Sequence, residues 1–139
     1  MKIMSVDFGD ARTGIALCDK SELLASPLTV IKERAFEKAA EKVSSLAKAE
    51  KAELIVVGYP KNMDGSCGDR AKKCSDFKDL VEALSGIPCE LWDERGTTIT
   101  AHNFLNETNV RGKKRKDVVD AVAAVIILEN YLSYRRNNK

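Results

Sequence analysis

The amino-acid sequence predicts an α/β fold: a five-stranded mixed sheet, three antiparallel strands and then two parallel ones, flanked by helices. Two observations lead to this expectation. Only short turns separate the first three strand-like segments, and such connections allow antiparallel pairing alone. Segments of helical length precede each of the last two, and helical crossovers join parallel strands. At 139 residues the chain fits one domain, which we expect to span residues 1–139.

The expected strands are short apolar runs bounded by turn residues. In chain order they occupy residues 2–7, 14–18, 28–31, 54–58 and 89–93. The first stops at Phe8-Gly9-Asp10, and the second returns from that turn as the other arm of a hairpin. The third follows Ser26-Pro27, a pair that breaks regular structure. Residues 54–58 are apolar throughout, as in a strand buried on both faces.

The expected helices show apolar residues at three- and four-residue spacing. They occupy residues 35–51, 69–84, 97 or 98 to 106, and 117–134, with a basic loop at 107–116 between the last two. Phe36 and Val43 belong to the apolar stripe of the first helix. Gly86 follows the second as a stop signal, and Thr97 or Thr98 can cap the third.

Basic residues are concentrated in two parts of the chain, although the formal net charge is only +2. They are Arg111, Lys113, Lys114, Arg115 and Lys116 in one segment, and Arg135, Arg136 and Lys139 in the C-terminal tail. Without these eight, 15 of the 23 basic groups remain against 21 acids, which leaves a charge of −6. Such local positive charge attracts a polyanion, so we expect a nucleic-acid partner. A solvated loop and a fraying tail are the structural alternative.

The composition predicts neither a membrane protein nor a secreted one. Apolar residues make up 44% of the chain, and charged residues, 32% of the total, interrupt every long apolar run. The N-terminal segment reaches Asp7 where a secretory signal would continue its apolar run. We therefore expect a cytoplasmic protein with no membrane partner.

The cysteines do not form a pattern typical of a metal site. Cys18, Cys67, Cys74 and Cys89 lack the short paired spacing of zinc ligands, and His102 is the only histidine. We expect free thiols, with a regulatory disulfide between Cys67 and Cys74 as the alternative.

Three carboxylates occupy positions where an acid costs free energy. Asp7 ends the first strand, Glu94 follows the last one, and Asp120 lies on the apolar stripe of the final helix, four residues before Ala124. Acids from these three elements can converge on one edge of such a sheet. Oxygen ligands of this kind suit Mg²⁺ or Mn²⁺ rather than zinc. Two such ions about 4 Å apart support phosphodiester hydrolysis.

Each acid also has a structural explanation. Asp7 can cap the turn before Gly9. Asp93 and Glu94 can cap the helix start at Thr97 or Thr98, or pair with Arg95. Side chains alternate along a strand, so only one of the two acids can face the site, and Asp93 is the alternative to Glu94. The helix dipole favours an acid near position 120 by about 0.3–1 kcal/mol. Asp117 is better explained as a helix cap than as an auxiliary ligand.

These residues belong to a series of short motifs in a fixed order along the chain. In order, the motifs are Asp7-Phe8-Gly9 with Arg12 and Gly14, Val56-Val57-Gly58-Tyr59-Pro60 with Asn62-Met63-Asp64-Gly65, Asp93-Glu94-Arg95 with Thr97-Thr98, and Lys116 leading to Val119-Asp120 and Ala123-Ala124. Together they resemble the YqgF/RuvX family of bacterial proteins. Two positions depart from the family pattern: Gly96 replaces a bulky apolar residue and Tyr59 replaces Leu.

The resemblance implies a ribonuclease-H-like fold and a metal-dependent nuclease that matures the 5′ end of pre-16S ribosomal RNA. Cleavage of four-way DNA as a Holliday junction resolvase is the alternative that it implies. Asp7, Glu94 and Asp120 would be the catalytic, metal-binding acids. Nucleic acid, structured RNA ahead of branched DNA, would contact Arg12, Arg95, Arg111, Lys113, Lys114, Arg115 and Lys116.

Functions of other classes also fit parts of the sequence. Asp7-x-Gly9 followed by Gly14 resembles the first phosphate loop of the sugar-kinase and actin superfamily. Those proteins close two lobes around ATP, whereas this chain fits only one, so the sequence does not favour ATP hydrolysis. A non-catalytic module that binds RNA or the ribosome would need the basic segment without the acids. A resolvase cuts two strands symmetrically and needs a homodimer, whereas a monomer can trim RNA.

Overall fold

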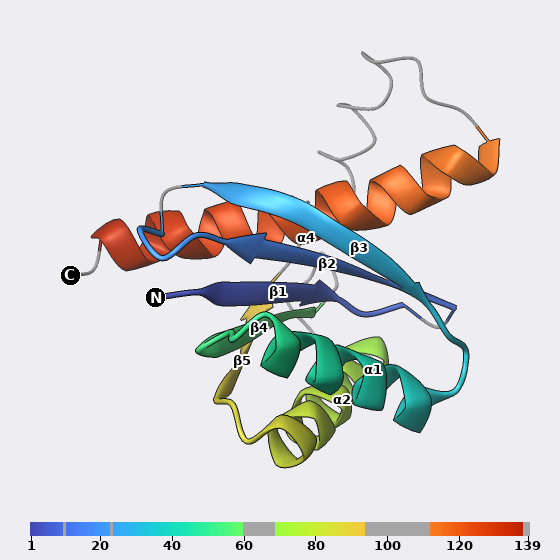
Figure 1. Cartoon of the computed structure of the whole chain (residues 1–139). Coiled ribbons are helices and arrows are strands. Elements are labelled where there is room, and N and C mark those ends of the chain that lie inside the picture. The colour runs from blue at the N-terminus through green and yellow to red at the C-terminus, as the bar shows by residue number, and fades with distance from the viewer. Residues whose placement is uncertain (10, 23, 60–68, 94–111, 138–139) are drawn as a thin grey trace.

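A computed structural model of the chain describes residues 1–9, 11–22, 24–59, 69–93 and 112–137 (Figure 1). The elements in chain order are β1 (Ile3–Asp7), β2 (Arg12–Cys18), β3 (Ala25–Lys32), α1 (Phe36–Ala49), β4 (Leu54–Tyr59), α2 (Asp69–Ser85), β5 (Cys89–Asp93) and α4 (Gly112–Asn137). The strands form one sheet in the order β3-β2-β1-β4-β5. β1, β2 and β3 pair antiparallel, and β4 pairs parallel with both β1 and β5. The predicted mixed sheet is therefore confirmed.

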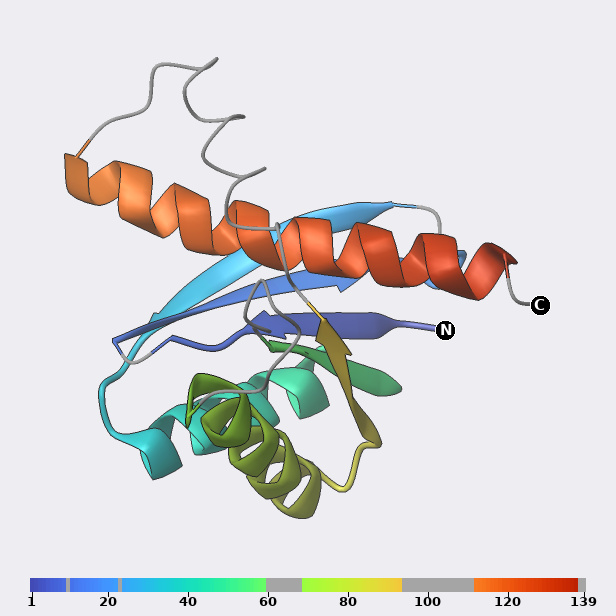
Figure 2. The ribbon, with the colours of Figure 1, turned by 180° about the vertical axis from the view of Figure 1, so that it is seen from behind.

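Helices cover both faces of this sheet (Figures 1 and 2). α1 and α2 pack on one face, where Met4, Val6, Ile55 and Val57 belong to the same apolar cluster as Val43 and Phe77 of the helices. α4 crosses the other face, where Ile3, Ala16 and Val56 pack with Ile127 and Leu128. Strand residues alternate between the two clusters, as the pleat of a strand requires.

The largest differences from the predicted boundaries lie in β3 and α4. β3 begins at Ala25 and includes Pro27, where a break was expected. Proline is tolerated because β3 is an edge strand and a register irregularity lies between Ile15 and Ala16 of its neighbour. α4 begins at Gly112, so residues 113–116 are helical and not part of a loop. The helix expected near 97–106 lies outside the described residues.

Three cysteines are buried free thiols: Cys18, Cys74 and Cys89. Burial raises the pKa of Cys18, and it raises that of Cys89 to about 12, so neither forms a reactive thiolate at neutral pH. This confirms the expectation of free thiols for these residues. Cys67 lies outside the described residues. Within the described ranges no helix is long and apolar enough to cross a membrane.

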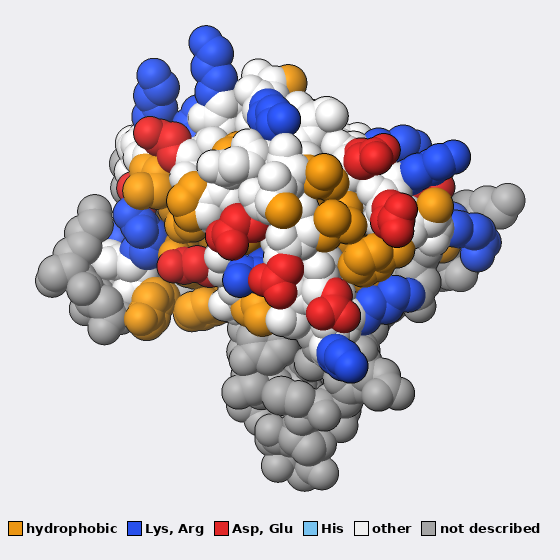
Figure 3. Space-filling model, turned by 90° about the horizontal axis from the view of Figure 1, so that it is seen from below, with side chains coloured by type: hydrophobic (Ala, Val, Ile, Leu, Met, Phe, Trp, Pro, Cys, Tyr) orange, Lys and Arg blue, Asp and Glu red, His pale blue; other side chains and the backbone are white. Residues whose placement is uncertain are grey.

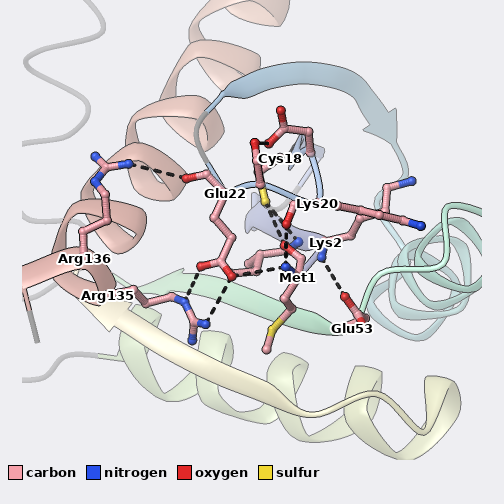
Figure 4. Close-up of polar contacts among 11 residues, drawn as sticks. Met1, Lys2, Cys18, Lys20, Glu22, Glu53, Arg135 and Arg136 are labelled. Atoms are coloured by element: carbon pink, nitrogen blue, oxygen red, sulfur yellow. Dashed lines mark hydrogen bonds and ion pairs between the residues drawn. The ribbon is translucent and has the colours of Figure 1, made fainter. Parts of the chain in front are cut away.

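A polar cluster joins the two ends of the described chain (Figure 4). The carboxylate of Glu22, in the connection from β2 to β3, accepts a 2.7 Å hydrogen bond from Nε of Arg135 in α4. It also accepts a 3.2 Å bond from the ammonium group of Met1. The Arg135 guanidinium, together with this ammonium group, holds the pKa of Glu22 below its usual value. The cluster therefore fastens the C-terminal half of α4 to the sheet.

We expect Glu22→Gln to lower the free energy of unfolding at pH 7 by about 1–2 kcal/mol, because charge-assisted hydrogen bonds contribute about this much. A lowered carboxyl pKa stabilises the fold above the unfolded-state value near 4.3, and this stability is lost as pH falls through the folded-state pKa. The difference between wild type and variant should therefore shrink below about pH 4. Urea unfolding from pH 7 to pH 3 measures it.

Glu41→Gln, an exposed glutamate on α1, is the matched control and should change stability little at any pH. A Glu22→Gln difference that stayed constant over this range would show that the carboxylate charge is not what stabilises the cluster.

Candidate active site

The carboxyl ends of β1, β4 and β5 lie at one edge of the sheet because these three strands run parallel. The start of β2 and the end of β3 lie at the same edge, since Asp7 pairs with Gly14 and Arg12 pairs with Lys32. Loops that leave the carboxyl ends of parallel strands commonly carry functional sites. We call this end of the sheet, where β1, β4 and β5 finish and β2 begins, the β1 edge.

Asp7 is the last residue of β1, and packing on both faces of the sheet holds it there. Ile3 and Ser5 face α4, so the alternation of the strand places Asp7 on the α4 face as well. The next residue, Phe8, is buried on the opposite face, where its ring stacks on Phe77 with 4.2 Å between centroids. Asp7 itself is half-buried. An acid is thus fixed at the rim between two packed layers.

The turn after Asp7 brings Arg12 back beside it. A side chain on Gly9 would place its Cβ 2.1 Å from the carbonyl oxygen of Arg12, a distance no real contact reaches, so the turn needs glycine at this position. Gly14 then pairs with Asp7, and Arg12 is the diagonal neighbour of Asp7 on the same face. Diagonal neighbours in an antiparallel pair lie about 7–8 Å apart. Arg12 therefore lies beside Asp7 on the α4 face of the sheet.

A buried hydrogen bond fixes the position of α4 on this face. The Ser5 hydroxyl donates to the carbonyl oxygen of Ala124 at 2.6 Å, and both residues are fully buried. α4 runs antiparallel to β1, because Ser5 contacts Ala124 whereas the Met1 end of the strand lies near Arg135 (Figures 1 and 4). Asp7 lies two residues beyond Ser5, which is about 7 Å along the strand.

Position 120 lies one helical turn before Ala124, about 6 Å along α4 in the same direction as the step from Ser5 to Asp7. The backbone of α4 at position 120 therefore lies level with the end of β1. The structure thus brings the helix position that carries Asp120 to the β1 edge.

β5 reaches the same edge on the other side of β4. Glu90 accepts a hydrogen bond from the hydroxyl of Tyr131 of α4, and the Trp92 ring meets the Tyr131 ring edge-on at 5.5 Å. Burial and the hydrogen bond to Glu90 raise the pKa of Tyr131 to about 12. Glu90 and Trp92 thus face α4, while Cys89 and Leu91 pack on the other face.

The remaining predicted site residues divide into two groups. Lys113, Lys114, Arg115 and Lys116 begin α4. Glu94, Arg95 and Arg111 lie outside the described residues. Among the side chains that the structure describes, no group of three histidine, cysteine or acidic residues could hold a metal ion.

Sequence reasoning missed Ser5, the residue that fixes α4 against β1. A buried serine in an apolar strand is the one signal that pointed to it, because a buried hydroxyl needs a hydrogen-bond partner. Its partner is a main-chain carbonyl 119 residues away, which no local pattern indicates.

The family model described as "RuvX: Holliday junction resolvase" matches residues 1–134. This chain belongs to the RuvX family. A Halothermothrix orenii protein named "Putative pre-16S rRNA nuclease" is 44% identical over 135 residues, or 97% of this chain and 96% of that protein. One of the same name from Clostridioides difficile is 40% identical over 137 residues, or 99% and 97% of the two chains.

Solved structures with a similar fold include two resolvases. Thermus thermophilus RuvC in complex with a Holliday junction substrate has a TM-score of 0.63 at 13% identity, covering 99% of this chain and 96% of that one. Fowlpox virus resolvase with Holliday junction DNA has a TM-score of 0.56 at 12% identity, covering 96% and 98%. At these identities the likeness shows the fold alone, and it confirms the ribonuclease-H-like fold predicted for this RuvX protein.

We expect Ser5→Ala to lower the free energy of unfolding by about 1–2 kcal/mol, because a short buried hydrogen bond between β1 and α4 is lost. Ser44→Ala is the matched control: Ser44 is also buried, but its hydroxyl lies 3.4 Å from the Val81 carbonyl oxygen and donates a weaker bond. Chemical denaturation of both variants measures the difference. Equal losses would mean that the Ser5 bond is no stronger than the bond that Ser44 makes.

Proposed function

We propose that this RuvX protein is a divalent-metal-dependent nuclease that acts on the 5′ end of pre-16S ribosomal RNA, and that Asp7, Glu94 and Asp120 form its active site. The Ser5–Ala124 hydrogen bond carries the proposal, because it brings position 120 of α4 level with Asp7. The family relationship supports hydrolytic cleavage of nucleic acid.

The alternation of β5 supports Glu94 over Asp93 as the third acid. Trp92 faces α4, as Asp7 does, and position 94 has the parity of Trp92 in the alternation of a strand. Position 93 has the parity of Leu91, which packs toward α1 and α2. Gly58 of β4 pairs with Trp92 and has no side chain to fill the space between β1 and β5 on the α4 face.

The donor set fits a hard divalent cation. Asp7, Glu94 and Asp120 offer carboxylate oxygens only, and Mg²⁺ or Mn²⁺ prefers such ligands. When bound, such an ion supplies Lewis-acid stabilisation of the negative charge that develops on the phosphate. Burial of Val6 and Phe8 on either side of Asp7 keeps this carboxylate in place without reorganisation during the reaction.

Cationic residues at the β1 edge support a polyanionic substrate. Arg12 is the diagonal neighbour of Asp7, and its guanidinium group can bind two oxygens of one phosphate. Residues 113–116 place four cations in the first turns of α4, where the helix dipole disfavours positive charge. Phosphate groups bound there would offset this cost, and we propose that these residues hold the backbone of the nucleic acid.

The names of the relatives favour ribosomal RNA over DNA as the substrate. The family description and the Holliday junctions bound by the two structural neighbours support a second candidate, a resolvase acting on four-way DNA. A resolvase would act as a homodimer, whereas the RNA nuclease can act as a monomer. We also propose that the protein acts in the cytoplasm and that residues 1–139 form one domain.

We expect Asp7→Asn to reduce the cleavage rate at least about 100-fold, because loss of a metal ligand removes several kcal/mol of transition-state stabilisation. The assay compares cleavage of a 5′-extended precursor of 16S RNA and of a four-way DNA junction, each with Mg²⁺ and with Mn²⁺. Asp76→Asn, an exposed aspartate on α2, is the control and should cleave at the wild-type rate.

If the Asp7→Asn variant cleaves at the wild-type rate, Asp7 is not part of the site. If wild type and variant both bind RNA and neither cleaves either substrate, the protein is a binding module and the proposed nuclease function is wrong.

A further inference from the structure

An aromatic groove runs along β5, the last strand in the order of the sheet. Its volume is about 730 Å³. The side chains that matter here come from α2, β5 and α4, and they are Lys78, Glu90, Trp92, Tyr131, Tyr134 and Arg135. Figure 2 shows the carboxyl end of β5 next to α4, as the contacts of Trp92 with the two tyrosines require.

Three rings form the α4 side of this aromatic groove. Trp92 meets Tyr131 edge-on with 5.5 Å between ring centroids, and the Tyr134 ring lies 5.3 Å from Trp92 at an angle of 55°. Tyr131 is buried, whereas Trp92 is half-buried and Tyr134 is 51% exposed. The cluster thus holds two rings at the surface, and a flat ligand stacked on them would remove their apolar area from water.

The charged groups of the aromatic groove already have partners. Lys78 pairs with Asp79 at 3.2 Å, and Arg135 donates to Glu22. Glu90 accepts a hydrogen bond from the Tyr131 hydroxyl through one oxygen. A carboxylate has about four lone pairs, so Glu90 can also accept from the amino group of a base. These groups suit a flat ring with N–H groups on its edge better than they suit a phosphate.

The surface of α1 and α2 differs from the aromatic groove. Side chains of both charge signs are interspersed with apolar ones there (Figure 3). A hollow on α1 is lined by residues without an aromatic ring, namely Glu41, Lys42, Ser45, Leu46 and Ala49. Among the residues that the structure describes, the most exposed aromatic side chain, Tyr134, therefore lies in the groove along β5.

The register of the sheet places the aromatic groove level with Asp7. Val6 pairs with Val57. The next residues of these strands, Asp7 and Gly58, therefore lie side by side, and Gly58 pairs with Trp92. The three form a row across the α4 face, and at about 4.8 Å between neighbouring strands the main chain of Trp92 lies about 10 Å from that of Asp7. Gly58 places no side chain between them.

We propose that the aromatic groove binds unpaired bases of the substrate strand next to the cleaved phosphate, by stacking on Trp92 and Tyr134. The proposal rests on the proposed function, in which Asp7 marks the position of cleavage. At about 3.4 Å per stacked nucleotide, a span of about 10 Å corresponds to about three nucleotides, so one strand can reach both places. Bases can stack on protein rings only where they are not stacked inside a double helix. The substrate is thus single-stranded beside the cut.

The test uses Trp92, the only tryptophan of the chain, as a fluorescent reporter. Unstructured single-stranded RNA is titrated into the full chain in EDTA, which prevents metal-dependent cleavage. We expect bases stacked on the indole to quench its emission, and the same strand annealed to its complement to quench it much less. Binding of the single strand without quenching, or equal quenching by both forms, would overturn the proposal.

Tyr134→Ala should weaken binding of the single-stranded RNA about tenfold without changing its salt dependence, because a ring stacks on a base but neutralises no phosphate. Tyr134→Phe keeps the ring and should bind like wild type. The side chain is exposed, so both variants should fold, as thermal unfolding can verify. Leu28→Ala removes an exposed apolar side chain from β3, at the other border of the sheet, and is the matched control that should also bind like wild type.

Two further results would contradict stacking on Tyr134. If Tyr134→Phe binds as weakly as Tyr134→Ala, the hydroxyl rather than the ring makes the contact. If Tyr134→Ala binds RNA like wild type but changes the oligomeric state in analytical ultracentrifugation, the aromatic groove is an interface between two copies of this chain.

Failure of this proposal and failure of the nuclease function give different results, since binding in EDTA does not depend on catalysis. Weakened binding by Tyr134→Ala, together with a wild-type protein that cleaves neither RNA nor the DNA junction, would support the aromatic groove and refute the nuclease. Wild-type binding and quenching by Tyr134→Ala, together with an inactive Asp7→Asn enzyme, would refute the aromatic groove alone.

Discussion

The hydrogen bond from the Ser5 hydroxyl to the Ala124 carbonyl fixes how α4 lies across the sheet. Once that bond is made, the positions of nearby α4 residues along the strands follow from the rise of an α-helix, about 1.5 Å per residue. Apolar contacts of Ile127 and Leu128 would allow the helix to slide, since burial has no direction. A short hydrogen bond in a fully buried place does not allow this.

The two faces of the sheet have different tasks. The α1 and α2 face carries the aromatic cluster of Phe8, Phe36 and Phe77, which holds the end of β1 in place. The α4 face carries Asp7 and the helix position of Asp120. Strand alternation separates the two sets residue by residue, so the residues that stabilise the β1 edge do not compete for space with those that we propose to perform chemistry.

Most of the fold could be predicted from the sequence because its elements have clear periodicity and punctuation. Turn residues after Asp7 and helix-length crossovers determined the strand directions. The errors have local causes. Pro27 indicates a break in most strands, but an outermost strand such as β3 tolerates proline. Basic residues are disfavoured at a helix N-terminus, so residues 113–116 have the composition of a loop although they are helical.

The site was less accessible to sequence reasoning. Asp7 and Asp120 stood out because acids at a strand end and on an apolar stripe are costly. Ser5 was hidden because its partner lies at the far end of the chain.

Pro27 has a consequence for how this protein behaves at high concentration. An outermost strand exposes unpaired main-chain groups that other molecules can extend into a shared sheet, which is a route to aggregation. Pro27 removes one main-chain donor from β3, and Lys32 adds charge to the same strand. Both features discourage association of β3 with a strand of another molecule.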